Sequence, residues 1–128
     1  MTEHHMYLKM KELLKEKPIR IQRIEQQCVP DLFFRHKHGG GWIEFKIVDT
    51  RGFNIKIPFR PGQFFWIKDY VLLGEQIYLF CIDMNAVLWI IRNRDIAQEY
   101  SIIDFKTIAK PIYWRDLTAS ILLNILGG

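Results

Sequence analysis

The sequence predicts a single α/β domain built on a mixed sheet. Apolar residues recur at helical spacing in three separate stretches, and short apolar or alternating runs typical of strands lie between them. An apolar share of 49 %, with 9 Phe, 5 Tyr and 4 Trp, is ample for a core in a chain of 128 residues. Since no repeat, linker or low-complexity segment interrupts residues 1–128, we expect one domain.

The first expected element is a helix from Thr2 to about Lys17. Thr2 is a suitable N-cap, and Pro18 cannot continue a helix. The apolar stripe of this helix consists of Met6, Tyr7, Met10, Leu13 and Leu14.

Three strands are expected next, over residues 19–26, 31–36 and 42–48. Val29-Pro30 separates the first strand from the second, because proline lacks a backbone donor and restricts the residue before it. His38-Gly39-Gly40-Gly41 separates the second strand from the third, and a flexible hairpin turn is expected there.

The segment from Asp49 to Arg60 is expected to be irregular or to hold one short strand, with Arg51-Gly52 as its turn. Pro61 then opens a helix over residues 62–73, in a position that prolines tolerate, and Gly74 ends it. The remaining expected elements are strands at 76–83 and 86–92, a short helical patch after Asp95, and a final helix at 116–126.

The third strand has two chemically different faces. Side chains alternate along a strand, so Ile43, Phe45 and Ile47 share one apolar face that would meet the core. Glu44 and Lys46 share the other face, where a carboxylate and an ammonium lie side by side. This pattern is suited to holding a divalent metal beside a phosphate.

A second acid, Asp31, stands at the start of the preceding strand. Asp31 and Glu44 are the expected ligands of Mg²⁺, with the Phe45 carbonyl as a further oxygen. Lys46 would orient an attacking water or stabilise charge on the phosphate. Structural alternatives stay open, since Asp31 suits a turn after proline and Glu44 with Lys46 suits an ion pair on a solvated sheet face.

The formal charge of +4 suits a polyanionic partner without requiring one. Two cysteines, Cys28 and Cys81, are too few for a disulfide framework, and the N-terminus lacks a signal-peptide pattern. No apolar run approaches the ~20 residues that span a bilayer. We therefore expect a soluble, cytoplasmic protein without membrane contact.

Several motifs together resemble the PD-(D/E)XK nuclease superfamily. They are Arg23-Ile24-Glu25, Pro30-Asp31, Gly41-Trp42-Ile43-Glu44-Phe45-Lys46 and the block from Phe59 to Trp66. The likeness covers roughly residues 19–92 and is greatest to small phage-type nucleases related to VRR-NUC domains and Holliday-junction resolvases. It implies a restriction-endonuclease-like core in the order αβββαβ, with a central mixed sheet flanked by helices.

The resemblance also implies roles for further residues. Gln63 would face the active site from the N-terminus of its helix, and Arg60 would point toward a backbone phosphate. An additional catalytic acid is expected, for which Glu25 is preferred over Glu3. Candidate DNA contacts besides Arg60 are Arg23, Lys37, His38 and Arg51.

The implied activity is that of a Mg²⁺-dependent DNA endonuclease, with Mn²⁺ able to substitute. Branched DNA, above all the four-way junction of DNA recombination, is the expected substrate, and a homodimer in a phage-infected host cytoplasm is the expected form. Alternatives are a flap-specific, single-strand-specific or nicking nuclease of phage replication, an inactive DNA-binding module of the same fold, and a dimeric interaction protein.

Overall fold

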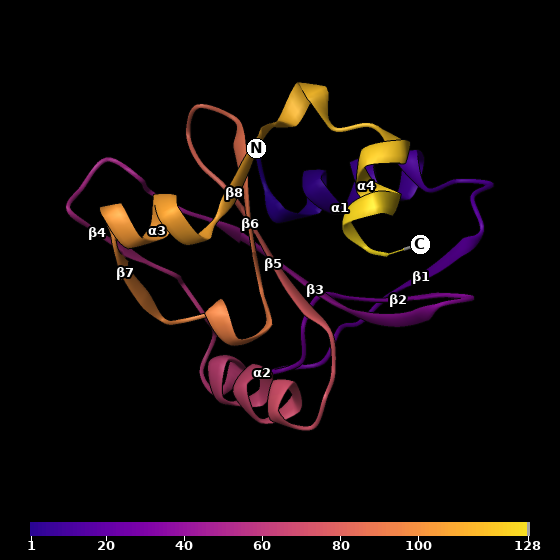
Figure 1. Cartoon of the computed structure of the whole chain (residues 1–128), viewed down its shortest axis with the longest axis horizontal. Helices are drawn as coiled ribbons and strands as arrows, with labels where there is room; N and C mark the ends of the chain where they lie inside the picture. Colours follow the sequence, from indigo (N-terminus) through magenta and orange to yellow (C-terminus); the bar gives the residue numbers. More distant parts are fainter. Residues whose placement is uncertain (128) are drawn as a thin grey trace.

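A six-stranded mixed sheet with helices on both faces forms the centre of the protein (Figure 1). The computed structural model describes residues 1–127. The helices are α1 (Glu3–Leu13), α2 (Gln63–Leu72), α3 (Ile102–Ile108) and α4 (Ala119–Ile125), with single 3₁₀ turns η1 (Asn93–Asp95) and η2 (Trp114–Asp116). The strands are β1 (Ile19–Arg23), β2 (Leu32–His36), β3 (Gly39–Ile47), β4 (Asn54–Lys56), β5 (Ile77–Ile82), β6 (Val87–Arg92), β7 (Glu99–Ser101) and β8 (Lys110–Tyr113).

The strand order in the main sheet is β1-β2-β3-β5-β6-β8. Only the central β3–β5 pair is parallel, and α2 lies in the crossover that joins these two strands. The other neighbours in this sheet are antiparallel, and β4 and β7 form a separate two-stranded ribbon. The predicted α/β class with a mixed central sheet is therefore confirmed.

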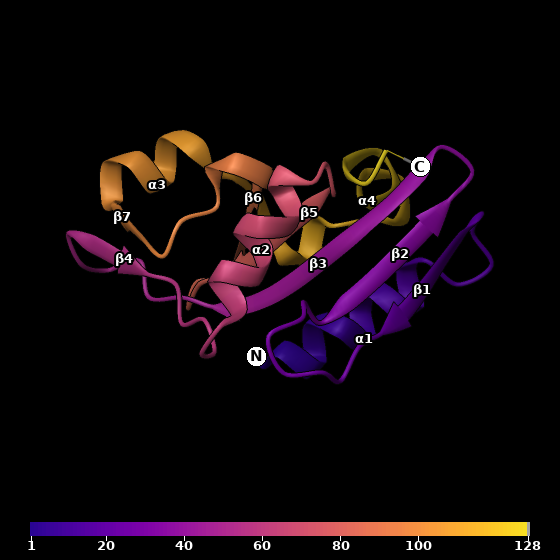
Figure 2. The ribbon, with the colours of Figure 1, turned by 90° about the horizontal axis from the view of Figure 1, so that it is seen from below.

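Each face of the sheet has its own apolar core. Helices α1 and α4 cover one face and bury, among others, Met6, Met10, Phe34, Phe45, Phe80 and Leu122. Helices α2 and α3 cover the other face, where the buried residues include Ile55, Ile67, Leu79, Ile91 and Phe105 (Figure 2). Among the described residues, none of the helices is long and apolar enough to cross a membrane.

The N-terminal helix begins as predicted and ends early. Thr2 Oγ1 accepts a hydrogen bond from the backbone N–H of His5, and the His5 side chain accepts from the Thr2 N–H, which completes a capping box. The helix ends at Leu13 because Glu16 has a left-handed φ of 61°, so the chain turns before it reaches Pro18.

Two predicted boundaries in the middle of the chain are wrong. The three glycines 39–41 belong to β3 rather than to the hairpin turn, and a Cβ on Gly41 would lie 2.5 Å from the carbonyl oxygen of Gln76 on the neighbouring segment. Pro61 precedes helix α2 instead of opening it. The N-cap is Gly62, whose φ of 80° is a conformation that favours glycine.

The C-terminal third departs most from the prediction. Residues 99–113 form β7, α3 and β8, none of which was expected. The single turn η1 ends at Asp95, and the helix that follows Asp95, α3, begins only at Ile102. The final helix begins at Ala119 because Thr118 caps it and residues 114–116 form only one 3₁₀ turn. The optional short strand between Asp49 and Arg60 is present as β4.

Candidate metal and phosphate site

Strands β2 and β3 bring the two predicted acids together. Leu32 lies opposite Ile43 in the antiparallel ladder, so Asp31 stands beside Glu44. The backbone N–H of Asp31 donates to Glu44 Oε1 at 3.0 Å, and the N–H of Phe45 donates to Asp31 Oδ2 at 2.9 Å. Each carboxylate is therefore oriented by the backbone of the other strand.

The third acid that the structure brings into this cluster is Glu3, whereas Glu25, the preferred candidate, lies outside the cluster. Carboxylate oxygens of Glu3, Asp31 and Glu44 all lie within 4.8 Å of one another. The side chain of Glu25 is 82 % exposed and its nearest ion partner is Arg23, at 3.9 Å. The physical reason is that β1 ends at Arg23, so Glu25 lies in a surface loop, whereas α1 begins directly beside the sheet.

One pattern in the sequence favours Glu3. Glu3 precedes Met6 by three residues and Met10 by seven, so it lies on nearly the same helical face as the two residues that α1 buries in the core. A carboxylate in the first turn of a helix, on the face that packs against the sheet, is directed toward the sheet. The loop residue Glu25 has no such constraint.

Lys46 is paired with Glu44 inside the protein. Its Nζ lies 2.9 Å from Glu44 Oε2, and the two side chains are 3 % and 0 % exposed. Both project to the α2 side of the sheet, opposite to the buried Ile43 and Phe45. Ile47, which was also expected in the core, is 38 % exposed because it is the last residue of β3.

Burial and the charges of neighbouring residues raise the pKa values of two acids of the site. Burial, followed by the charge of Asp31, raises the pKa of Glu44 to about 8, although Lys46 opposes this shift. Burial also raises the pKa of Glu3, again against the influence of Lys46. The cluster therefore favours an additional positive charge, either a proton or a cation.

Gln63 is the first residue of α2 and contacts the backbone of Arg60. It is fully buried, and its Oε1 accepts a hydrogen bond from the backbone N–H of Arg60 at 3.2 Å. Within the described part of the chain its Nε2 has no hydrogen-bond partner. A buried amide donor without a partner costs free energy, about 1–3 kcal/mol, unless a ligand or water accepts its proton.

Arg60 lies at the exposed side of the cluster. Its guanidinium lies 3.7 Å from Asp31 Oδ1 and donates to the carbonyl of Val29 at 3.4 Å. A recess of about 140 Å³ opens here; Glu3, Tyr7, Arg23, Asp31, Phe45 and Arg60 line it. Solvent and a phosphate group can therefore reach the acids from this side.

The predicted DNA contacts are not all near the acids. Arg23 lines the recess, and its guanidinium lies over the Tyr7 ring at 5.0 Å. Lys37 and His38 form the turn at the opposite end of β2, about 20 Å from Asp31 at the usual rise per residue of a strand. The guanidinium of Arg51 is held by Asp49 at 2.8 Å on the surface.

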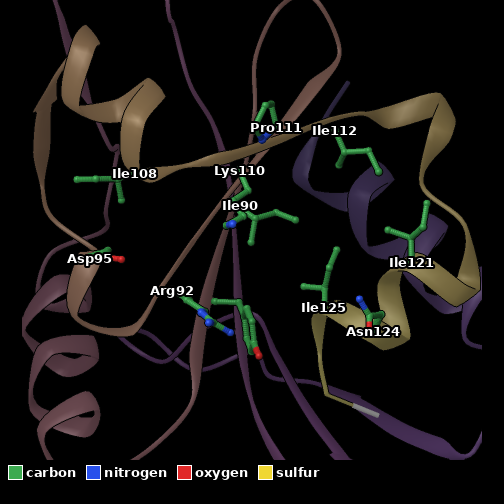
Figure 3. A pocket seen from close by; sticks show the side chains of 11 residues that line it. Ile90, Arg92, Asp95, Ile108, Lys110, Pro111, Ile112, Ile121, Asn124 and Ile125 are labelled. Carbon is green, nitrogen blue, oxygen red and sulfur yellow. The ribbon is translucent and has the colours of Figure 1, made fainter.

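A larger cavity of about 480 Å³ lies elsewhere, between α4 and the β6–β8 edge of the sheet (Figure 3). Five of its eleven lining residues are isoleucines, among them Ile90, Ile112, Ile121 and Ile125. Arg92, Asp95 and Lys110 also line it, and no cluster of acids converges there among residues 1–127. The cavity therefore offers no set of carboxylate ligands for a metal.

Comparisons with profiles of protein families, with curated proteins and with solved structures give no match. The chemistry of the site is therefore argued from its residues.

The donor set fits a hard divalent cation. Three carboxylates supply oxygen ligands of the kind that Mg²⁺ and Mn²⁺ prefer, and no soft ligand lies in the recess. Burial is the main cause of the raised pKa of Glu44, and the charge of Asp31 adds to it, so a bound cation would help to keep Glu44 ionised. Glu3, Asp31 and Glu44 are the residues that would hold it.

The correction from Glu25 to Glu3 gives a direct prediction. Glu3→Gln is expected to weaken Mn²⁺ binding about tenfold or more, since the cluster loses one of three anionic ligands. The matched control Glu25→Gln removes the same charge from an exposed loop and is expected to leave the affinity unchanged. Calorimetric titration of both variants measures this, and a larger effect of Glu25→Gln would restore the original assignment.

Metal affinity is expected to depend on pH through Glu44. Because its pKa is raised to about 8, a cation must displace a proton at neutral pH. Apparent Mn²⁺ affinity should therefore rise by about tenfold per pH unit up to the pKa of Glu44 and level off above it. Titrations from pH 6 to pH 9 in buffers of different ionisation enthalpy would count the released proton, and a flat profile would contradict the assignment.

The same shift predicts how stability of the metal-free protein changes with pH. Between the ordinary value of 4.5 and about 8, the folded state binds a proton at Glu44 that the unfolded state has lost. The free energy of unfolding should therefore fall as pH rises through this window. Glu44→Gln should flatten this dependence, which chemical denaturation at several pH values would reveal.

Proposed function

We propose that this protein is a metal-dependent endonuclease that hydrolyses phosphodiester bonds in DNA. The observation that supports the proposal most strongly is the convergence of three carboxylates beside one buried lysine. Gln63, which accepts a hydrogen bond from the backbone of Arg60, adds a buried amide N–H group without an acceptor. An ion pair on a solvated sheet face would not be buried, would not attract a third acid and would not leave the Gln63 amide unpaired.

Each residue of the site has a role in this reaction. Asp31, Glu44 and Glu3 would hold Mg²⁺ or Mn²⁺, which, when bound, supplies charge neutralisation at the phosphate and a more acidic water. Lys46 is fixed beside Glu44 and would orient the attacking water or stabilise the charge that develops on the phosphoryl oxygens.

The start of α2 supplies two further groups for binding phosphate. The Nε2 of Gln63 has a free proton to donate to a phosphate oxygen. The Arg60 guanidinium at the mouth of the recess is a bidentate donor that suits a phosphate diester. Together they would place the scissile phosphate against the acids.

The order of elements supports the finer fold assignment. One helix, three strands, a helix and two strands appear in the sequence α1, β1, β2, β3, α2, β5 and β6, with the short β4 inserted before α2. From α1 to β5, with β4 set aside, this agrees with the αβββαβ order that the resemblance to PD-(D/E)XK nucleases implies, and β6 is an addition to it. Glu44 and Lys46 lie on β3 and Asp31 directly precedes β2.

Branched DNA is the proposed substrate, and a homodimer is the proposed active form. The net charge of +4 agrees with a nucleic-acid partner. The preference for a four-way junction comes from the resemblance to phage-type resolvases, and two symmetric cuts would require two active sites.

The test uses three labelled DNAs, a four-way junction, a flap and a linear duplex, each with Mg²⁺, Mn²⁺ or EDTA. Paired, metal-dependent nicks in the junction are the expected result. Preference for the flap or for a single strand would instead support a flap-specific or single-strand-specific nuclease of phage replication. Tight binding without cleavage would indicate a DNA-binding module. No retardation of any DNA at low salt would contradict a nucleic-acid partner altogether.

A further inference from the structure

The cavity of about 480 Å³ between α4 and the β6–β8 edge has one face of the main sheet as its floor (Figure 3). Ile90 lies opposite Lys110 in the β6–β8 ladder, and Arg92 lies opposite Tyr78 in the β5–β6 ladder. Residues two apart on a strand point to the same side, and so do residues directly opposite each other. The four side chains therefore share the face of the sheet that α4 covers, and all four line the cavity.

Helix α4 forms the wall beside this floor. Ile121, Asn124 and Ile125 are three or four residues apart on it, so they lie on one side of the helix, and all three line the cavity. The helix is held against the sheet by Leu122 and Leu126, which are buried in the core. The cavity is therefore a preformed space between fixed elements.

Positive charge exceeds negative charge in the lining. Arg92 and Lys110 are cations and Asp95 is the one acid among the eleven lining residues, which leaves a formal excess of one positive charge. Because Ile90 lies opposite Lys110, Arg92 and Lys110 hold diagonal positions in the sheet, about 7–8 Å apart. The ion pairs found among residues 1–127 involve neither of these two cations. Both are therefore available to one anionic group.

Tyr78 adds a buried hydroxyl to the same lining. Its side chain is 5 % exposed, and the hydroxyl makes no hydrogen bond to another residue in the part of the chain that the structure describes. Buried tyrosine hydroxyls usually have a partner. The hydroxyl beside Arg92 is thus a further donor for a ligand in the cavity.

We propose that this cavity binds a small amphipathic carboxylate, whose apolar part lies between the isoleucines and whose single anionic group meets Arg92 and Lys110. Ligand pockets of about 300–1,000 Å³ combine apolar walls with a few polar groups in this way. An excess of one positive charge suits a monoanion better than a phosphate monoester, which carries about −1.5 to −2. The proposal does not depend on nuclease activity, because Glu44 and Lys46 project to the other face of the sheet.

The first test measures binding of decanoate, decan-1-ol and decylammonium by calorimetric titration, at concentrations below those at which micelles form. The three probes share an apolar chain and differ in the charge of the head group. Decanoate should bind about tenfold more tightly than decan-1-ol, and decylammonium should bind most weakly. Equal binding of the three would overturn the proposal, as would failure of decanoate to bind at millimolar concentration.

Variants of the lining test which residues are responsible. Arg92→Gln and Lys110→Gln should each weaken decanoate binding about tenfold and leave decan-1-ol binding unchanged. The control Arg94→Gln removes an exposed charge that does not line the cavity and should change neither affinity. Ile121→Trp, which fills part of the space, should weaken both ligands. Unchanged decanoate binding in all the lining variants would overturn the proposal.

A measurement on the unaltered protein locates the ligand even if a variant fails to fold. With labelled isoleucine methyl groups, decanoate should shift the NMR signals of Ile90, Ile112 and Ile125 and leave those of Ile55 and Ile67, in the other core, unchanged. Shifts confined to Ile55 and Ile67, or spread over the whole chain, would contradict the assignment. If the cavity signals respond to protein concentration and not to decanoate, the occupant is a second copy of this chain and the proposal is wrong.

Discussion

Asp31→Asn is expected to reduce DNA cleavage by about 10³-fold or more while the protein stays folded. The asparagine oxygen can still accept the hydrogen bond from the Phe45 N–H, which lies 2.9 Å from the native carboxylate. What is lost is one negative charge in a cluster of three acids. Cleavage of a labelled junction under single-turnover conditions measures the effect.

Removal of this charge has a second consequence at Glu44. The charge of Asp31 contributes to the raised pKa of Glu44, so Asp31→Asn should lower that pKa from about 8. The variant should therefore be at least as stable as the wild type at neutral pH while it binds Mn²⁺ more weakly. Asp69→Asn, on the exposed side of α2, is the matched control and should alter neither property. Full activity of Asp31→Asn would remove the proposed site.

The core of the fold and much of the site could be predicted from patterns that have a simple physical basis. Alternation along β3 separates Ile43 and Phe45 from Glu44 and Lys46, and the two pairs do lie on opposite faces. The turn-forming residues around Pro30 placed Asp31 at the start of a strand beside β3. These are local constraints, which a sequence records directly.

The remaining features depend on contacts between distant segments. Whether Glu3 or Glu25 joins the acids is decided by where β1 ends and how α1 packs. The helical spacing of Glu3 with Met6 and Met10 places it on the buried face of α1, but only the packed fold brings that face beside Asp31 and Glu44. The elements β7, α3 and β8 contain three, seven and four residues, too few for a clear periodicity. They are ordered by packing, as the full burial of Phe105 indicates.

The buried pair of Lys46 and Glu44 has the other large expected effect. Under the proposed function, Lys46→Ala should lower the rate of cleavage by about 10²–10³-fold, since it removes the cation that would lie beside the reacting phosphate. It should also leave Glu44 buried without its partner at 2.9 Å. Because Lys46 opposes the upward shift, the pKa of Glu44 should then rise above about 8, and the variant should bind Mn²⁺ more weakly at neutral pH.

Loss of catalysis must be separated from loss of stability, because Lys46→Ala leaves the buried Glu44 without its partner, and a buried polar group without a partner costs about 1–3 kcal/mol. The double variant Glu44→Gln/Lys46→Met replaces both charges with neutral side chains of similar size, and it should regain most of the stability without regaining cleavage. Denaturation measures the first property and junction cleavage the second. If the double variant cleaved DNA as fast as the wild type, the pair would have only a structural role, and the reaction would have to depend on other residues.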